Sequence, residues 1–133
     1  MEFWSYNDGD GPFLITQLMT SIVVTREQVK AKLDRGEPVQ IMDVRSKNAY
    51  SMEHIRHARS IPCEDIVDRA DEVLNRGRQV VVYGNDEKDI LAERAAETLV
   101  KRGFADVCVL PDGLRGWRAA GYLTVSGEEM SVD

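Results

Sequence analysis

The feature that most constrains the fold is a short apolar run and the pattern that follows it. Val80 to Tyr83 reads VVVY, a small charged loop comes next, and an alanine-rich pattern with helical spacing extends from about Asp89 to Arg102. A strand without alternating polar residues is typical of a parallel sheet that is buried on both faces. The run therefore predicts a central parallel strand that leads into a loop and a helix.

The same order of strand and helix repeats along the chain. A capping box, with Thr25 as N-cap and Gln28 reaching back to it, predicts where the first helix begins. The alternation predicts an α/β fold with a five-stranded, mainly parallel sheet and helices on both faces. Strands are expected at 22–24, 39–43, 58–61, 79–83 and 106–110, helices at 25–36, 66–74, 89–102 and 113–120, and a short helix or turn at 47–53.

One domain accounts for most of the 133 residues. Residues 21–125 carry the strand and helix pattern, and a segment of this length suits a single domain with its own core. Residues 1–20 have no clear period and are expected to form an N-terminal extension that is ordered only in part. Residues 126–133 are expected to form a C-terminal tail.

Charge and composition exclude several classes of function. The formal net charge of −6 argues against nucleic acid as a partner, because phosphate binding needs clustered Lys and Arg. The apolar stretch Pro12–Met19 is too short to span a bilayer, and Asp8 and Asp10 precede it where a signal peptide carries positive charge. Two cysteines, Cys63 and Cys108, are too few for a disulfide scaffold. We therefore expect a cytoplasmic protein that binds neither nucleic acid nor membrane.

The candidate functional loops follow from the fold class. In an open parallel sheet, functional loops gather at the carboxyl ends of the strands. The loops after Asp43, Ile61 and Tyr83 are therefore the segments where a site is expected.

Several segments in the right order resemble the rhodanese family. Ile41–Arg45 (IMDVR) is similar to the family strand that ends in Asp-Val-Arg, and Tyr50–Pro62 (YSMEHIRHARSIP) is similar to its Tyr-x-x-Gly-His-Ile-Pro-Gly-Ala…Pro segment. Val80–Tyr83 matches the strand before the catalytic loop, and Gly103–Val107 and Asp112–Tyr122 match the closing segment. The resemblance covers about residues 20–125, and it implies a rhodanese-like three-layer sandwich.

The chain departs from the family where function would lie. The family's catalytic cysteine directly follows the apolar strand, and the matching residue here is Gly84. Family loops usually continue with glycine and a basic residue, whereas this loop reads Asn85-Asp86-Glu87-Lys88-Asp89. Smaller departures are Glu53, Arg56 and His57, where the family often has Gly, Pro and Gly.

These departures conflict with the chemistry that the resemblance implies. Rhodaneses move a sulfane sulfur from an anionic donor such as thiosulfate to a cysteine thiolate, and backbone N–H groups with positive charge hold the anion. Gly84 supplies no nucleophile. Asp86, Glu87 and Asp89 outnumber Lys88, and like charges raise a thiol's pKa and repel an anionic donor. We therefore expect no catalytic residue in this loop and no sulfur transfer there.

The loop Gly84–Asp89 has three interpretations. In the first, it is a solvent-exposed loop that leads into a helix, whose dipole favours acidic residues near its N-terminus. Alternatively, it is a surface that recognises a basic partner protein or peptide. Because Gly84 also allows a nest of backbone donors, the third interpretation is a weak site for a small anion.

Cys63 is the thiol that offers an alternative. It lies at the same expected edge of the sheet as Gly84 and precedes a helix, whose N-terminus lowers a thiol's pKa, although Glu64 and Asp65 act in the opposite direction. Cys108 lies in mid-strand and is expected to be a buried core thiol. The alternative function is thus a thiosulfate or persulfide sulfurtransferase that uses Cys63 or a partner's thiol.

The remaining polar candidates are expected to be structural. Asp43 and Arg45 stand at a strand end, where the resemblance also implies an ion pair that anchors the loop. His54 and His57 have no obvious third ligand, and His54 resembles a structural histidine that hydrogen-bonds the local backbone. Neither a metal ion nor a cofactor is expected.

Overall fold

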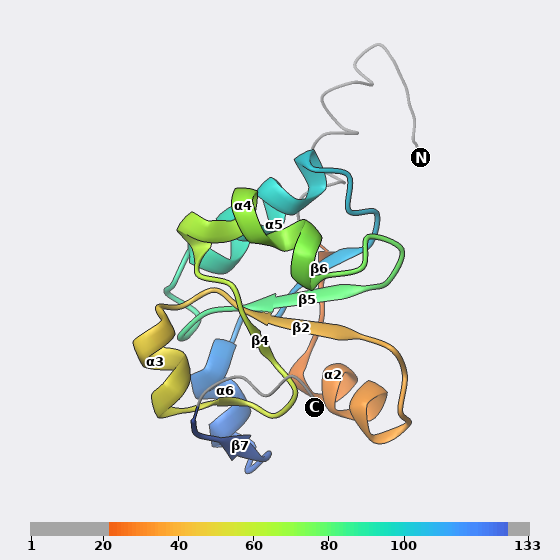
Figure 1. The fold of residues 1–133 in the computed structure, drawn as a ribbon. Coiled ribbons are helices and arrows are strands. Elements are labelled where there is room, and N and C mark those ends of the chain that lie inside the picture. Colours follow the sequence, from red (N-terminus) through yellow and green to blue (C-terminus); the bar gives the residue numbers. More distant parts are fainter. Residues whose placement is uncertain (1–21, 128–133) are drawn as a thin grey trace.

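A computed structural model describes residues 22–127 (Figure 1). The expectations for residues 1–20 and for most of the C-terminal tail lie outside the described residues. In chain order the elements are β1 (Ile22–Val23), α2 (Arg26–Asp34), β2 (Gln40–Asp43), α3 (Lys47–Met52), β3 (His54–Ile55), β4 (Arg59–Ser60), the 3₁₀ turn η1 (Cys63–Asp65), α4 (Ile66–Val73), β5 (Val80–Tyr83), α5 (Leu91–Lys101), β6 (Val107–Val109), α6 (Gly113–Ala119) and β7 (Thr124–Val125).

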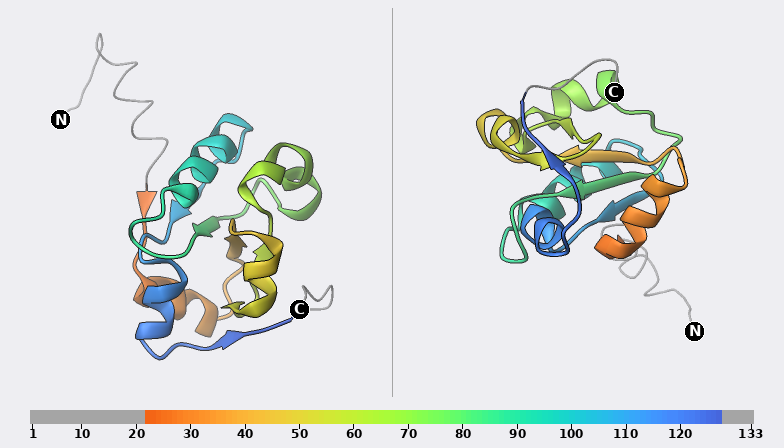
Figure 2. Two further views of the ribbon diagram at one scale, coloured as in Figure 1. Left: turned by 90° about the vertical axis from the view of Figure 1, so that its left-hand side faces the viewer. Right: turned by 90° about the horizontal axis from the view of Figure 1, so that it is seen from below.

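The main sheet has five strands in the order β1-β6-β5-β2-β4, and every neighbouring pair is parallel. Helices α4 and α5 cover one face, and α2 and α6 cover the other (Figure 1). The rotated views show the same three layers (Figure 2). The predicted α/β fold, a five-stranded parallel sheet between two layers of helices, is confirmed.

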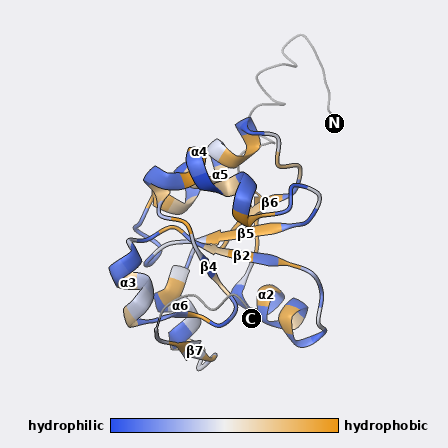
Figure 3. Cartoon of the chain, in the orientation of Figure 1, coloured by the Kyte–Doolittle hydropathy of each residue, from blue (hydrophilic) through white to orange (hydrophobic). Residues whose placement is uncertain are grey.

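The position of strand β5 explains why polar and apolar residues do not alternate in its sequence. Val80 and Val82 belong to the core beneath α4 and α5, whereas Val81 and Tyr83 belong to the core on the α2 and α6 side. All four side chains are fully buried, and β5 appears hydrophobic in the middle of the molecule (Figure 3). Each face of the strand thus packs against its own layer of helices.

The first helix begins where the sequence predicts. Thr25 Oγ1 accepts a hydrogen bond from the Gln28 amide at 3.0 Å, and Gln28 Oε1 accepts one from the Thr25 amide at 2.8 Å. Both halves of the capping box are therefore present. Within residues 22–127, no helix is long and apolar enough to cross a bilayer.

A small second sheet was not predicted. Strands β3 and β7 pair antiparallel, with His54 opposite Val125, and two-residue strands are too short to show a period in the sequence. Glu53 reinforces this pair, because its carboxylate accepts hydrogen bonds from Arg118 and from the Thr124 hydroxyl, both at 2.7 Å. The segment after α6 is thereby attached to the end of α3.

Candidate functional site

Three loops meet at the carboxyl ends of β2 and β5, on the left in Figure 1. The Val44 amide donates to the Tyr83 carbonyl oxygen at 3.2 Å, and the Cys63 amide donates to the Val44 carbonyl oxygen at 3.1 Å. Because the strands run parallel, the loops after Asp43, Ile61 and Tyr83 leave the sheet side by side. The structure thus places the three candidate loops at one end of the sheet.

A buried polar network supports this end of the sheet. The Asp43 carboxylate is fully buried, and Arg45 donates to it through Nε at 3.0 Å and Nη2 at 2.8 Å. The Tyr83 hydroxyl donates to the same carboxylate at 2.5 Å and accepts from the Ile55 amide at 3.1 Å. Arg45 also donates to the Glu53 carbonyl oxygen. The network therefore joins β2, β5 and the segment Glu53–Ile55, which includes β3.

The network shifts the pKa values of Tyr83 and Arg45. Burial, together with the Asp43 carboxylate, raises the pKa of Tyr83 well above its usual range, so the hydroxyl remains a donor. Burial disfavours the Arg45 charge, but the Asp43 carboxylate outweighs it and raises the pKa of Arg45. Sequence reasoning missed Tyr83 as a member of this network. The available signal was a tyrosine at the end of an otherwise aliphatic strand.

The loop after β5 is held by its own carboxylates. Asp89 Oδ2 accepts from the Asn85 amide and from Asn85 Nδ2, both at 3.0 Å, and Asp89 Oδ1 accepts from the Leu91 amide at 2.9 Å. Asp86 Oδ1 accepts from the Lys88 amide at 3.0 Å. Carboxylates of the loop thus engage the backbone amides of Asn85, Lys88 and Leu91.

Gly84 leaves room for this arrangement. It is buried, and a Cβ atom built on it would lie 2.7 Å from Asp89 Oδ2. A side chain at this position and the inward carboxylate cannot occupy the same space. The glycine and the position of Asp89 therefore depend on each other.

Helix α6 holds the loop from the other side. The Leu114 amide donates to the Gly84 carbonyl oxygen and the Arg115 amide to the Asn85 carbonyl oxygen, both at 3.0 Å. Gly113 has a φ of 63°, and a Cβ atom there would lie 2.7 Å from the Asn85 carbonyl carbon. Only glycine permits this close approach, so the first turn of α6 fixes the backbone of the loop.

A small acidic cavity lies beside the loop. Its volume is about 50 Å³. Four carboxylates line it, those of Asp86, Glu87, Asp89 and Glu93, and no basic residue does. The other lining residues are Gly84, Ile90, Ala92, Val109, Leu110 and Pro111. The cavity thus suits a cationic group.

The structure places Cys63 near this site but disfavours its thiolate. Its Sγ atom lies 4.0 Å from the Leu91 carbonyl oxygen and is partly buried. Burial raises the pKa of Cys63, the Glu64 and Asp89 carboxylates raise it further, and Arg94 lowers it. The raised pKa keeps Cys63 in the weakly nucleophilic thiol form at neutral pH.

The other candidates lie apart from the loop. Cys108 is buried in β6, as expected for a core thiol. The His54 ring stacks on Tyr50 at 3.7 Å between centroids, and its Nδ1 lies 2.8 Å from the Tyr50 carbonyl oxygen. His57 is exposed and has a φ of 74°, which fits a position where the rhodanese pattern often has Gly. Among residues 22–127, no group of three or more His, Cys, Asp or Glu side chains is arranged to hold a metal ion.

Comparison with known proteins gives one family. The profile of the rhodanese-like domain matches residues 25–120. The putative sulfur carrier protein YrkF of Bacillus subtilis is 32% identical over 94 residues, which cover 71% of this chain and 49% of that protein. An HTH-type transcriptional regulator of Mycobacterium tuberculosis is 33% identical over 98 residues, covering 74% of this chain and 42% of the regulator. The chain spans about half the length, or less, of these two curated relatives.

Solved structures agree with this family. The crystal structure of the Alr3790 protein from Anabaena has a TM-score of 0.73 at 36% identity, covering 78% of this chain and 80% of that one. The thiosulfate sulfurtransferase from Pseudomonas aeruginosa has a TM-score of 0.69 at 23% identity, covering 86% of this chain and 22% of that one. The second likeness concerns the fold alone.

We predict that Tyr83→Phe lowers the free energy of unfolding by about 2–4 kcal/mol, because the Ile55 amide and the Asp43 carboxylate each lose a buried partner. Urea unfolding measures the change. Tyr122→Phe is the control, since the half-buried Tyr122 ring packs against Trp117 and lies outside the network, and its effect should stay within about 0.5 kcal/mol. Equal effects of the two variants would contradict the role given to the network.

Proposed function

Because the chain belongs to the rhodanese-like domain family, we propose that it is a member without sulfurtransferase activity that binds a protein partner through the loop Gly84–Asp89. In this proposal Gly84 stands at the position of the family's catalytic cysteine. The observation that carries the proposal is the Asp89 carboxylate, which accepts hydrogen bonds from the Asn85 and Leu91 amides and lies against Gly84.

Sulfur transfer lacks two of its requirements at this loop. The loop contains no thiol, so no thiolate is available to take a sulfane sulfur. The donors that would stabilise an anion are engaged by Asp86 and Asp89, and both carboxylates repel thiosulfate. The same occupation disfavours the third interpretation of the loop, a site for a small anion.

The chemistry of the loop favours a basic protein or peptide as the partner. A cavity of about 50 Å³ is far below the roughly 300–1,000 Å³ of small-molecule pockets, but it is larger than the space that one water-sized group needs. A lysine ammonium from a partner fits this volume and the four carboxylates around it. Ile90, half-exposed at 50%, adds an apolar contact at the rim. The negative charge also repels nucleic acid and anionic membrane, and the two free cysteines fit a reducing cytoplasm.

The alternative function is sulfur transfer through Cys63 or through a partner's thiol. It has one observation in its favour, the likeness to a putative sulfur carrier protein. The raised pKa and partial burial of Cys63 argue against that thiol. We therefore keep the binding function as the proposal.

A first prediction concerns restoration of the thiol. Gly84→Cys alone should form a persulfide with thiosulfate only slowly, because the new side chain meets the Asp89 carboxylate. Gly84→Cys combined with Asp89→Ala should gain an added sulfur atom at least about tenfold faster, since the charge and the clash are both removed. Intact-mass spectrometry of the reduced proteins, in a Cys63→Ser background, measures the rate. Equal reactivity of the two variants, or none in either, would contradict the role given to Asp89.

A second prediction concerns the cationic partner. Glu87→Gln combined with Glu93→Gln should weaken the binding of a fluorescent oligolysine peptide by about fivefold, because the cavity loses two of its four charges. Fluorescence anisotropy at low salt measures the affinity. The matched control is Glu72→Gln with Glu97→Gln, which removes the same charge from exposed positions that do not line the cavity. If the control weakens binding equally, the peptide responds to net charge and the proposed surface is wrong.

A further inference from the structure

Glu53 is a departure from the rhodanese pattern that the proposed function does not use. The pattern often has Gly at this position, and a glycine has no side chain with which to reach its neighbours. The Glu53 side chain lies at the end of α3 and is 30% exposed. Its carboxylate therefore makes contacts that the usual residue cannot make.

These contacts join three elements of the fold. The Glu53 carboxylate accepts a hydrogen bond from Arg118 Nη2 in α6 and one from the Thr124 hydroxyl in β7, both at 2.7 Å. Hydrogen bonds from these two partners lower the pKa of Glu53, so the side chain keeps its charge at neutral pH. The end of α3, helix α6 and strand β7 thus meet at one carboxylate.

The segment Leu123–Gly127, which contains β7, forms a strap across the end of α3, below α3 and α6 in Figure 1. Its ladder with β3 is two residues long, and both residues of β7 are half-buried. The Gly127 amide donates to the Ser51 carbonyl oxygen at 2.7 Å, and Trp117 Nε1 donates to the Leu123 carbonyl oxygen at 2.9 Å. A ladder this short opens at a lower free-energy cost than the fully buried strands of the main sheet.

The backbone beside the Glu53 side chain belongs to the network under the loop. Arg45 donates to the Glu53 carbonyl oxygen, and the Ile55 amide donates to the Tyr83 hydroxyl at 3.1 Å. Tyr83 ends β5, and the loop begins at the next residue, Gly84. Glu53 therefore binds the strap with its side chain and the buried network with its backbone.

We propose that Glu53 is a positioning residue that couples the strap to the loop Gly84–Asp89. This inference rests on the function proposed for the loop and concerns its regulation. A partner that draws the strap away from β3 breaks the Thr124 bond and frees the segment that holds Tyr83, so the loop binds a cationic group less tightly. Because coupling between two sites is reciprocal, occupation of the loop holds the strap in place by the same factor.

Amide hydrogen exchange, followed by NMR, tests the coupling. In Glu53→Ala the Gly127 amide should exchange about tenfold faster, because the strap loses a charged hydrogen-bond partner. The Asn85 and Leu91 amides, which the Asp89 carboxylate holds, should exchange about threefold faster if the change reaches the loop. Glu53→Gln keeps an oxygen for the Thr124 hydroxyl, and its rates should lie between those of the native protein and Glu53→Ala.

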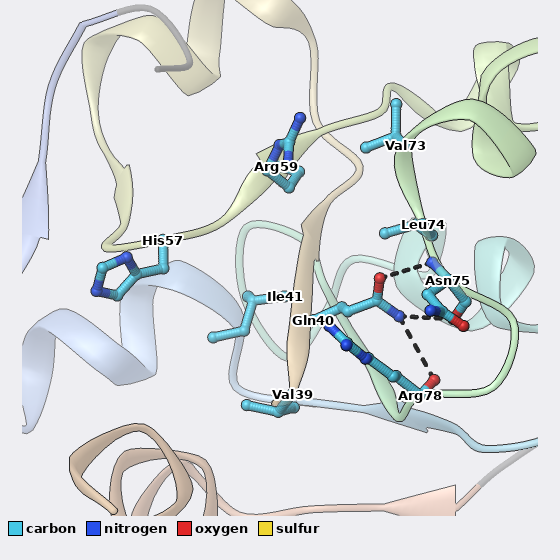
Figure 4. Close-up of a pocket in the computed structure, with 9 residues that line it drawn as sticks. All are labelled: Val39, Gln40, Ile41, His57, Arg59, Val73, Leu74, Asn75 and Arg78. Atoms are coloured by element: carbon cyan, nitrogen blue, oxygen red, sulfur yellow. Dashed lines mark hydrogen bonds between the residues drawn. The ribbon is translucent and has the colours of Figure 1, made fainter. Parts of the chain in front are cut away.

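Two control variants separate coupling from loss of charge or of stability. Glu37→Ala removes the same charge and an ion pair of 2.7 Å with Arg35, and the Glu37 side chain is 38% exposed. Gln40→Leu breaks a different attachment, at the amino end of β2, where Gln40 binds the Asn75 amide at 2.7 Å and the Asn75 carbonyl oxygen at 2.8 Å (Figure 4). Neither attachment involves the strap or the loop. Both controls should leave the two loop amides within about twofold of their native exchange rates.

Binding of the fluorescent oligolysine peptide tests the consequence for the loop. Glu53→Ala should weaken binding about threefold more than Glu37→Ala does, and saturating peptide should slow Gly127 exchange in the native protein. Unchanged Gly127 exchange in Glu53→Ala, unchanged loop amides in that variant, or an equal loop response in Gln40→Leu would overturn the coupling. Peptide binding that leaves Gly127 exchange unaltered would overturn it as well. If the loop amides respond to Glu53→Ala but the native protein binds no peptide, the coupling stands and the cationic partner proposed for the loop is wrong.

Discussion

The hydrogen bonds to the buried carboxylate of Asp43 are the interaction on which the loop end of the molecule depends. A charge without access to water is stable only when donors surround it, and here Arg45 and the Tyr83 hydroxyl supply them. Those donors come from the end of β5 and from the residue that follows Val44, and Tyr83 in turn accepts from Ile55. One charge thus sets the relative positions of the strand ends from which the loops depart.

The loop after β5 begins directly beside the hydrogen-bond network of Asp43, Arg45 and Tyr83. Tyr83 belongs to the network and Gly84 follows it, so the loop has little freedom at its first residue. The amides at the start of α6 then bind the Gly84 and Asn85 carbonyl oxygens. The Asp89 carboxylate points toward Gly84 and accepts hydrogen bonds from the Asn85 and Leu91 amides. The protein's own carboxylate therefore engages the amides of this loop, and in the function that we propose the remaining carboxylates bind a cationic partner.

Much of the fold could be predicted from local sequence patterns, because each pattern depends on residues that lie close together in the chain. The run VVVY has a buried residue on each face, and the Thr25 capping box acts within four residues. Strands β3 and β7 were missed because two residues carry no period. The partnership of Tyr83 with Asp43 spans 40 residues, and the inward turn of Asp89 depends on the space left by Gly84. Contacts of that kind are set by tertiary packing. The sequence therefore predicted where the loop lies along the chain, but not the hydrogen bonds within it.

The proposed absence of sulfur transfer at the loop end can be measured on the native protein. The reduced native protein is incubated with thiosulfate and cyanide, thiocyanate is followed, and intact mass is checked for an added sulfur atom. We expect no turnover above the buffer control and no gain in mass. Turnover with a sulfur adduct that disappears in Cys63→Ser would contradict it, and would move the active site to the loop after β4.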